Sequence, residues 1–172
     1  VADVILMLGL LLAVLFLAGP VNADPRGVSV EIKNKQGQRI GGYKESHALL
    51  IGVSNYIYGW PGLEAVPREL DLMEATLKRH GFNVVKRLNP TGRELKQTFE
   101  TFIDTYGYDP QNRLLFYFSG HGYTRSRGEK GYLVPADAPP PWRDERDFLR
   151  NALSIIKIQA WSRLMVAKHV LF

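Results

Sequence analysis

The segment Leu114 to Phe118 is apolar at every position and passes directly into Ser-Gly-His-Gly. A short apolar run bounded by turn-forming residues is typical of a strand buried on both faces, as in a parallel sheet covered by helices. Further strands are expected at 48–53 and 82–88, and the residues 169–172 open a fourth. The chain is therefore expected to fold around a sheet whose central strands have no solvent-facing side.

Helical patterns separate these strands. The segment 67–80 carries apolar residues at helical spacing, with Pro67 at its expected start and Gly81 as a left-handed stop. The segment 91–106 opens with Thr-Gly-Arg-Glu, the pattern of a capping box, and 155–165 has a third apolar stripe. Strands that alternate with helices predict an α/β fold, with a mainly parallel sheet and helices on both faces.

Composition limits the functional classes. The chain has 172 residues, of which 45% are hydrophobic, which is enough for one domain with a core. The net charge is +5, but no block of like charges occurs, so we expect a solvated basic surface rather than a nucleic-acid interface. None of the four histidines has metal-ligand spacing from another, so no zinc site is expected. No other metal and no cofactor is expected either. The chain has no cysteine, which excludes disulfides.

The chain divides into three parts. In residues 1–23 an apolar stretch, Val4 to Ala18, is followed by small residues, which predicts a signal peptide or, alternatively, an N-terminal membrane anchor. The protein is accordingly expected to be exported to the periplasm or outside the cell, or to be held at the membrane by this segment. Residues 24–47 are expected to form an edge strand or a tether, and residues 48–172 the α/β domain.

His121 is the first candidate for a functional residue. In parallel α/β sheets the active crevice lies beyond the carboxyl ends of the strands, and His121 follows such an end. Gly120 and Gly122 leave its ring unshielded, and Gly122 offers an amide beside it. A base next to a free N–H is the pairing that acyl transfer needs. The alternative is that a single histidine at a strand end serves packing or capping.

Five segments together resemble a known family. They are ALLIGVSNY, the helix ending in HGF, LLFYFSGHG, GYLVPADAP and KHVLF, and they cover residues 48–172 in order. This pattern resembles the caspase-like cysteine peptidases, in particular their bacterial, metacaspase-like relatives. The resemblance implies a three-layer caspase-like fold that hydrolyses peptide bonds in peptide or protein substrates through a Cys-His dyad. It also implies that His121 is the catalytic histidine and Gly122 the oxyanion-hole glycine.

The nucleophile implied by the resemblance is a cysteine at the end of the fourth strand, roughly 50 residues after the histidine. That position falls at the end of the chain, which contains no cysteine. We therefore expect the chain to be a fragment of the domain, incomplete at its C-terminus and inactive by itself. The alternative is a natively inactive caspase-like module that serves interaction or regulation.

Two acids are candidates for substrate binding. By the resemblance, Glu69 matches an acid that shapes a pocket for a basic residue before the scissile bond, although Arg68 replaces the family's Asn beside it. An exposed acid that stabilises the first turn of its helix is the alternative. Asp137 matches an acid common in the family after the histidine loop, or is a turn-forming residue before the prolines.

Two other enzyme or binding classes are disfavoured. A serine hydrolase built on Ser119 needs Gly-x-Ser-x-Gly, whereas this chain has Phe-x-Ser-x-His. A flavodoxin-like nucleotide binder needs a glycine-rich loop after the first strand, and GVSNYIYGW does not supply one. The sequence carries no prediction of oligomeric state.

Overall fold

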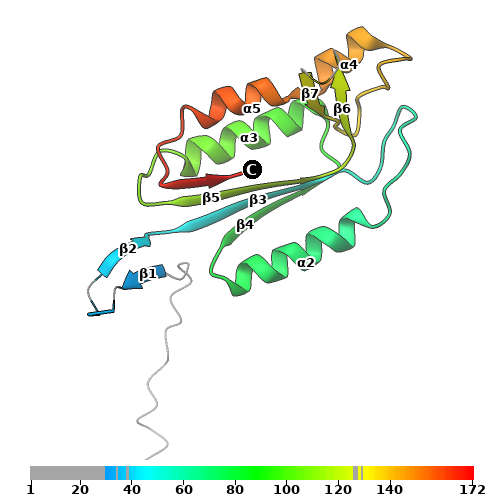
Figure 1. Cartoon of the computed structure of the whole chain (residues 1–172). Coiled ribbons are helices and arrows are strands. Elements are labelled where there is room, and N and C mark those ends of the chain that lie inside the picture. Colours follow the sequence, from blue (N-terminus) through cyan, green and yellow to red (C-terminus); the bar gives the residue numbers. More distant parts are fainter. Residues whose placement is uncertain (1–29, 34, 38, 126–127, 129) are drawn as a thin grey trace, which may run out of the picture.

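The computed structural model describes residues 30–33, 35–37, 39–125, 128 and 130–172. Its centre is a four-stranded sheet in which every neighbouring pair of strands is parallel. The order across the sheet is β4 (Asn83–Leu88), β3 (Ser46–Gly52), β5 (Arg113–Ser119) and β9 (His169–Leu171). This arrangement confirms the expected parallel α/β fold (Figure 1).

Helices cover both faces of this sheet, as Figure 1 shows. Helix α2 (Val66–Arg79) packs on one face, and α3 (Gly92–Tyr106) and α5 (Ile155–Ser162) pack on the other. Because side chains alternate along a strand, β3 sends Ala48 and Leu50 toward α2, and its odd-numbered residues toward α3. All seven residues of β3 are buried, which explains why residues 48–51 are all apolar.

The helix-end signals have the expected effect. The capping box of α3 is present, with Thr91 accepting from the Glu94 amide and the Glu94 carboxylate accepting from the Thr91 amide. Gly81 has φ of +77° just after α2, which is the left-handed geometry that glycine tolerates best. Helix α5 is shorter than the apolar stripe predicted, because it ends at Ser162 and not near residue 165.

Several elements were not foreseen in the sequence, although the apolar residues 132–134 had predicted a short extended piece that overlaps β7. A second, antiparallel sheet contains β6 (Gly122–Arg125), β7 (Lys130–Leu133) and β8 (Leu153–Ser154), and the short helix α4 (Glu145–Asn151) precedes β8. The segment expected as an edge strand or tether is a hairpin of β1 (Val30–Lys33) and β2 (Arg39–Tyr43), separate from the main sheet.

The expected export or anchor segment, residues 1–23, lies outside the described residues. Among the residues that the structure describes, no helix is both long and apolar enough to cross a membrane.

Candidate active site

His121 lies immediately beyond the carboxyl end of β5, at the turn from the main sheet into β6. Its backbone is held on both sides. The His121 N–H donates to the Tyr56 hydroxyl (2.7 Å), and the His121 carbonyl accepts from the Val134 N–H (3.0 Å). The turn that carries the histidine is thus tied to the loop after β3 and to the segment after β7.

The imidazole is oriented by a backbone carbonyl. His121 Nε2 lies 3.0 Å from the oxygen of Pro61, which belongs to the loop between β3 and α2. A carbonyl oxygen can only accept, so this contact places the ring proton on Nε2 and leaves the lone pair of the neutral imidazole on Nδ1. The ring is therefore held as a base that uses Nδ1.

Two aromatic side chains flank the imidazole. The rings of Tyr56 and Trp60 have centroids 4.8 Å and 5.2 Å from that of His121, and the His121 side chain is half-buried. The Trp60 indole donates to the Ala138 carbonyl (3.0 Å), and Trp142, which is 74% exposed, stands edge-on to it. The imidazole is thus in contact with two aromatic rings and remains partly exposed.

The Gly122 amide is directed away from the small sheet. Gly122 lies opposite Leu133 in the β6–β7 ladder, and the neighbouring pair, His121 and Val134, is hydrogen bonded. Hydrogen-bonded and non-bonded pairs alternate in an antiparallel ladder, so the Gly122 N–H points away from β7. Gly122 is also exposed, and its amide is therefore open to an incoming oxygen.

Glu69 lies at the same end of the sheet, on the α2 side. The Tyr117 hydroxyl donates to Glu69 Oε1 (2.5 Å) and the Ser119 hydroxyl donates to Oε2 (2.8 Å). Tyr117 and Ser119 are two apart on β5, so they share the face that meets α2. The two hydroxyls lower the pKa of the Glu69 carboxyl below its ordinary value, which keeps this exposed group ionised.

These contacts leave both interpretations of Glu69 open. The residue is an exposed acid in the first turn of α2, and it is also a carboxylate fixed beside the strand that carries His121. The contact with Ser119 weighs against a serine nucleophile, because that hydroxyl donates to a carboxylate rather than to an imidazole.

Asp137 has a structural partner. Its Oδ1 accepts from the N–H of Gly92 (2.7 Å), the first residue of α3. The neighbouring Ala136 N–H donates to the Pro90 carbonyl (3.0 Å), so the chain after β7 is fastened to the start of α3. The structure therefore gives the Asp137 carboxylate a helix-capping contact, which neither sequence interpretation had included.

Asn89 is a residue that the sequence interpretation missed. Its Oδ1 accepts from the amides of Ser54 (2.7 Å) and Asn55 (3.0 Å) and from the Ser54 hydroxyl (3.1 Å). Its φ is +53°, a left-handed geometry that asparagine tolerates better than most residues. The Asn-Pro pair after a strand was an available turn signal. Asn89 joins the ends of β3 and β4 and so fixes where the loop carrying Pro61 departs.

The arrangement combines a base on a fixed tautomer, an open amide and an ionised carboxylate at the carboxyl edge of a parallel sheet. In the described part of the chain no group of three or more His, Cys, Asp or Glu residues is placed to hold a metal ion. A base beside an open amide can accept a proton and can stabilise a developing oxyanion, which are two of the functions that acyl transfer needs.

Comparison with known proteins specifies the family. The caspase domain family matches residues 45–172, which is well over half of the chain, and the protein belongs to this family of cysteine-peptidase-like domains. A search of the curated proteins finds no match. The caspase-like resemblance of the sequence is thereby confirmed, and peptides or proteins are the class of substrate that the family indicates.

Proposed function

We propose that this domain is part of a bacterial, metacaspase-like cysteine endopeptidase in which His121 is the general base and Gly122 supplies the oxyanion donor. The observation that carries the proposal is the Pro61 contact, which holds the proton on Nε2 and leaves Nδ1 to accept one. His121 would take the proton of a thiol and later return it to the leaving amine, while the Gly122 N–H stabilises the tetrahedral oxyanion.

The thiol in this proposal comes from residues beyond Phe172 in a longer protein, since the 172 residues contain no cysteine. Leu171 of β9 pairs with Leu115 of β5, so a strand continuing in the same register would come level with His121 roughly five residues after Phe172. An apolar hollow of about 350 Å³ lies along this path, lined by Phe116, Phe118 and Phe172 among others. Its lining suits a buried strand.

Glu69 is proposed to bind a basic side chain before the scissile bond. Its carboxylate is held ionised by Tyr117 and Ser119, and Ser119 is two residues from His121. The direct evidence for Asp137 is only its contact with the Gly92 amide, so its proposed contribution is to position the α3 end of the site. We further propose that residues 1–23 direct export or anchor the protein to a membrane.

The test is peptidase activity of the complete gene product on peptides with arginine or lysine before the scissile bond. His121→Ala should lower kcat by about 10²- to 10⁴-fold, the range for a general base. His80→Ala is the matched control, because His80 is an exposed residue at the end of α2. Activity that survives His121→Ala at the level of the His80 variant would refute the assignment.

A catalytically inactive interaction module is the second candidate, and the absence of cysteine from the chain is the observation that favours it. The two candidates predict different residues after Phe172. A cysteine within about ten residues supports the peptidase. Serine or glycine in place of that cysteine, or a stop codon within the interval, supports the module if the parent protein also has no peptidase activity.

A further inference from the structure

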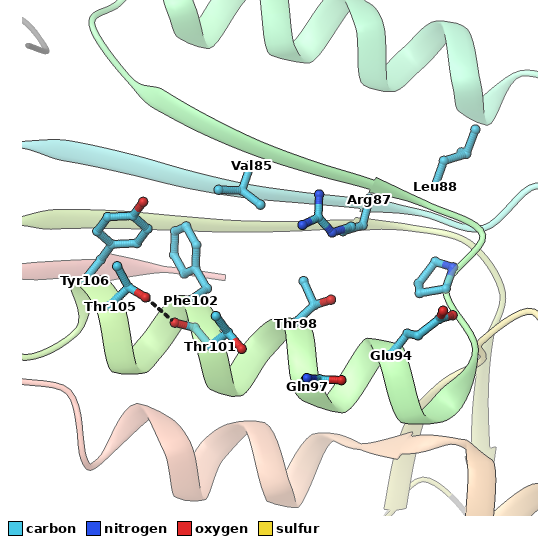
Figure 2. A pocket seen from close by; sticks show the side chains of 11 residues that line it. Val85, Arg87, Leu88, Glu94, Gln97, Thr98, Thr101, Phe102, Thr105 and Tyr106 are labelled. Atoms are coloured by element: carbon cyan, nitrogen blue, oxygen red, sulfur yellow. Dashed lines mark hydrogen bonds between the residues drawn. The ribbon is translucent and has the colours of Figure 1, made fainter.

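A groove of about 480 Å³ runs along the outer edge of the main sheet, away from His121 and the residues that hold it. It lies between the edge strand β4 and helix α3 (Figure 2). Strand β4 contributes Val85, Arg87 and Leu88 to its wall, and α3 contributes a polar row. The members of this row are Glu94, Gln97, Thr98, Thr101 and Thr105.

Among the described residues β4 is the last strand of the sheet, so no other described strand pairs with the outer side of its backbone. The Asn89 N–H donates inward to the Gly52 carbonyl (2.7 Å), so by alternation Val84, Lys86 and Leu88 direct their N–H and C=O groups outward. The Lys86 carbonyl confirms this direction, since it accepts from the Arg87 guanidinium (3.0 Å). Exposed edge groups of this kind are a template for another strand.

Arg87 is a charged residue of the groove that forms no ion pair with an acidic side chain among the described residues. Among the described residues its guanidinium has one hydrogen-bond acceptor, the neutral Lys86 carbonyl. The neighbouring Lys86 points to the other face, where it pairs with Asp71 and Glu74. Glu94, the acid of the groove, is occupied in the capping box with Thr91.

We propose that the β4–α3 groove binds an extended segment of a partner protein, which adds a strand to β4 and places an acidic side chain against Arg87. A carboxylate is a stronger acceptor for a guanidinium than a neutral carbonyl. The partner's acid would therefore draw Arg87 away from the Lys86 carbonyl and release that carbonyl for the new ladder. The hydroxyls of Thr98 and Thr101 have no hydrogen-bond partner among the described residues and face the same groove.

Charge favours such a partner over a second copy of this chain. Two copies of β4 paired about a two-fold axis would bring two Arg87 side chains onto the same face of the joined sheet, and like charges on neighbouring strands are destabilising. Lys86 adds nothing to this repulsion, since its charge is paired with Asp71 and Glu74 on the other face. An alternating strand with acids on one face meets Arg87 and Val85 on its groove side instead.

The probe is a blocked seven-residue peptide of alternating valine and glutamate, compared with the same peptide carrying lysine in place of glutamate. Amide NMR shifts of the 172-residue chain should move along β4 and α3 with the glutamate peptide, which should bind at least about tenfold more tightly than the lysine peptide. Arg87→Glu should reverse this preference. Arg93→Glu, an equal charge change at an exposed position of α3 outside the groove, should leave it unchanged.

Equal binding of the two peptides, or no shift with either, would overturn the proposal. A second test asks whether the edge is already occupied. If a second copy or another part of the same chain covers β4, the outward amides of Val84 and Lys86 will be protected from hydrogen exchange in the chain alone, and the proposal falls. Rapid exchange that slows only with the glutamate peptide supports it.

Discussion

Gly120→Ala should disturb the contact that positions His121. A Cβ at residue 120 would lie 2.9 Å from Phe118 Cζ and 3.0 Å from the Tyr56 hydroxyl oxygen. Carbon atoms pack best about 3.5–4.0 Å apart, so at least one of the two rings must shift. The Tyr56 hydroxyl is the acceptor of the His121 N–H, and its displacement weakens that bond.

The expected cost is about 1–3 kcal/mol, the range for an added methyl in a packed site. For a chain of this size, about 2 kcal/mol corresponds to a Tm lowered by about 4–8 °C. Gly122→Ala is the matched control, because its Cβ would meet only the Tyr132 carbonyl oxygen, at 3.7 Å. We expect its stability to stay within about 0.5 kcal/mol of the parent chain.

A double-mutant cycle isolates the cause. Tyr56→Phe by itself should cost about 1–3 kcal/mol, because the His121 N–H loses its acceptor. In the double variant the hydroxyl is already absent, so the alanine at residue 120 clashes with one group fewer. The free energies of unfolding should therefore fall short of additivity by about 1 kcal/mol.

Urea unfolding followed by circular dichroism measures the parent chain and all of these variants. Additive losses would show that the Tyr56 hydroxyl does not meet the new methyl group. A Gly120→Ala variant as stable as Gly122→Ala would show that the turn before His121 has more room than the structure gives it. Either result would refute the account of how this histidine is held.

Three other outcomes can be measured on the same chain. Asn89→Ala and Asn89→Gly both lose the three hydrogen bonds to the asparagine side chain, but only the alanine is also forced into a left-handed φ. Asn89→Ala should therefore be less stable than Asn89→Gly by about 1 kcal/mol in urea unfolding. Equal stability of the two variants would contradict backbone strain at this position. In Gly92→Ala the new Cβ would lie 2.3 Å from the Asn151 carbonyl oxygen. This variant should lose about 1–3 kcal/mol of stability, which lowers the Tm by several degrees. Gly62→Ala is the control, because its Cβ would have only an ordinary contact. Burial lowers the pKa of His47 below its ordinary 6.5, so on acidification the unfolded chain binds the proton before the folded chain does. Stability is therefore lost as the pH falls below about 6.5. His47→Gln should flatten the decline in Tm between pH 7 and 5, and an unchanged slope would exclude His47 as the source of that decline.

Much of the fold could be predicted because its signals are local. The apolar run of β5, the capping box before α3 and Gly81 after α2 each act within a few residues, and the structure contains all three. The same locality explains the errors. The stripe at 155–165 stayed apolar beyond the end of α5, and β6 and β8 have no apolar run of their own.

The candidate site likewise has some features that the sequence predicts and others that only the tertiary structure determines. The sequence by itself determined that His121 follows a buried parallel strand between two glycines, because strand burial and glycine turns depend on residue type. Only the tertiary structure decided that the imidazole donates to Pro61, that Tyr56 receives the His121 amide, and that Asp137 is turned toward α3. Backbone carbonyls occur at every residue, and nothing in a sequence distinguishes the one that will meet a side chain sixty positions away. That choice depends on how distant segments of the chain pack together, and it decides which nitrogen of the histidine can act as the base.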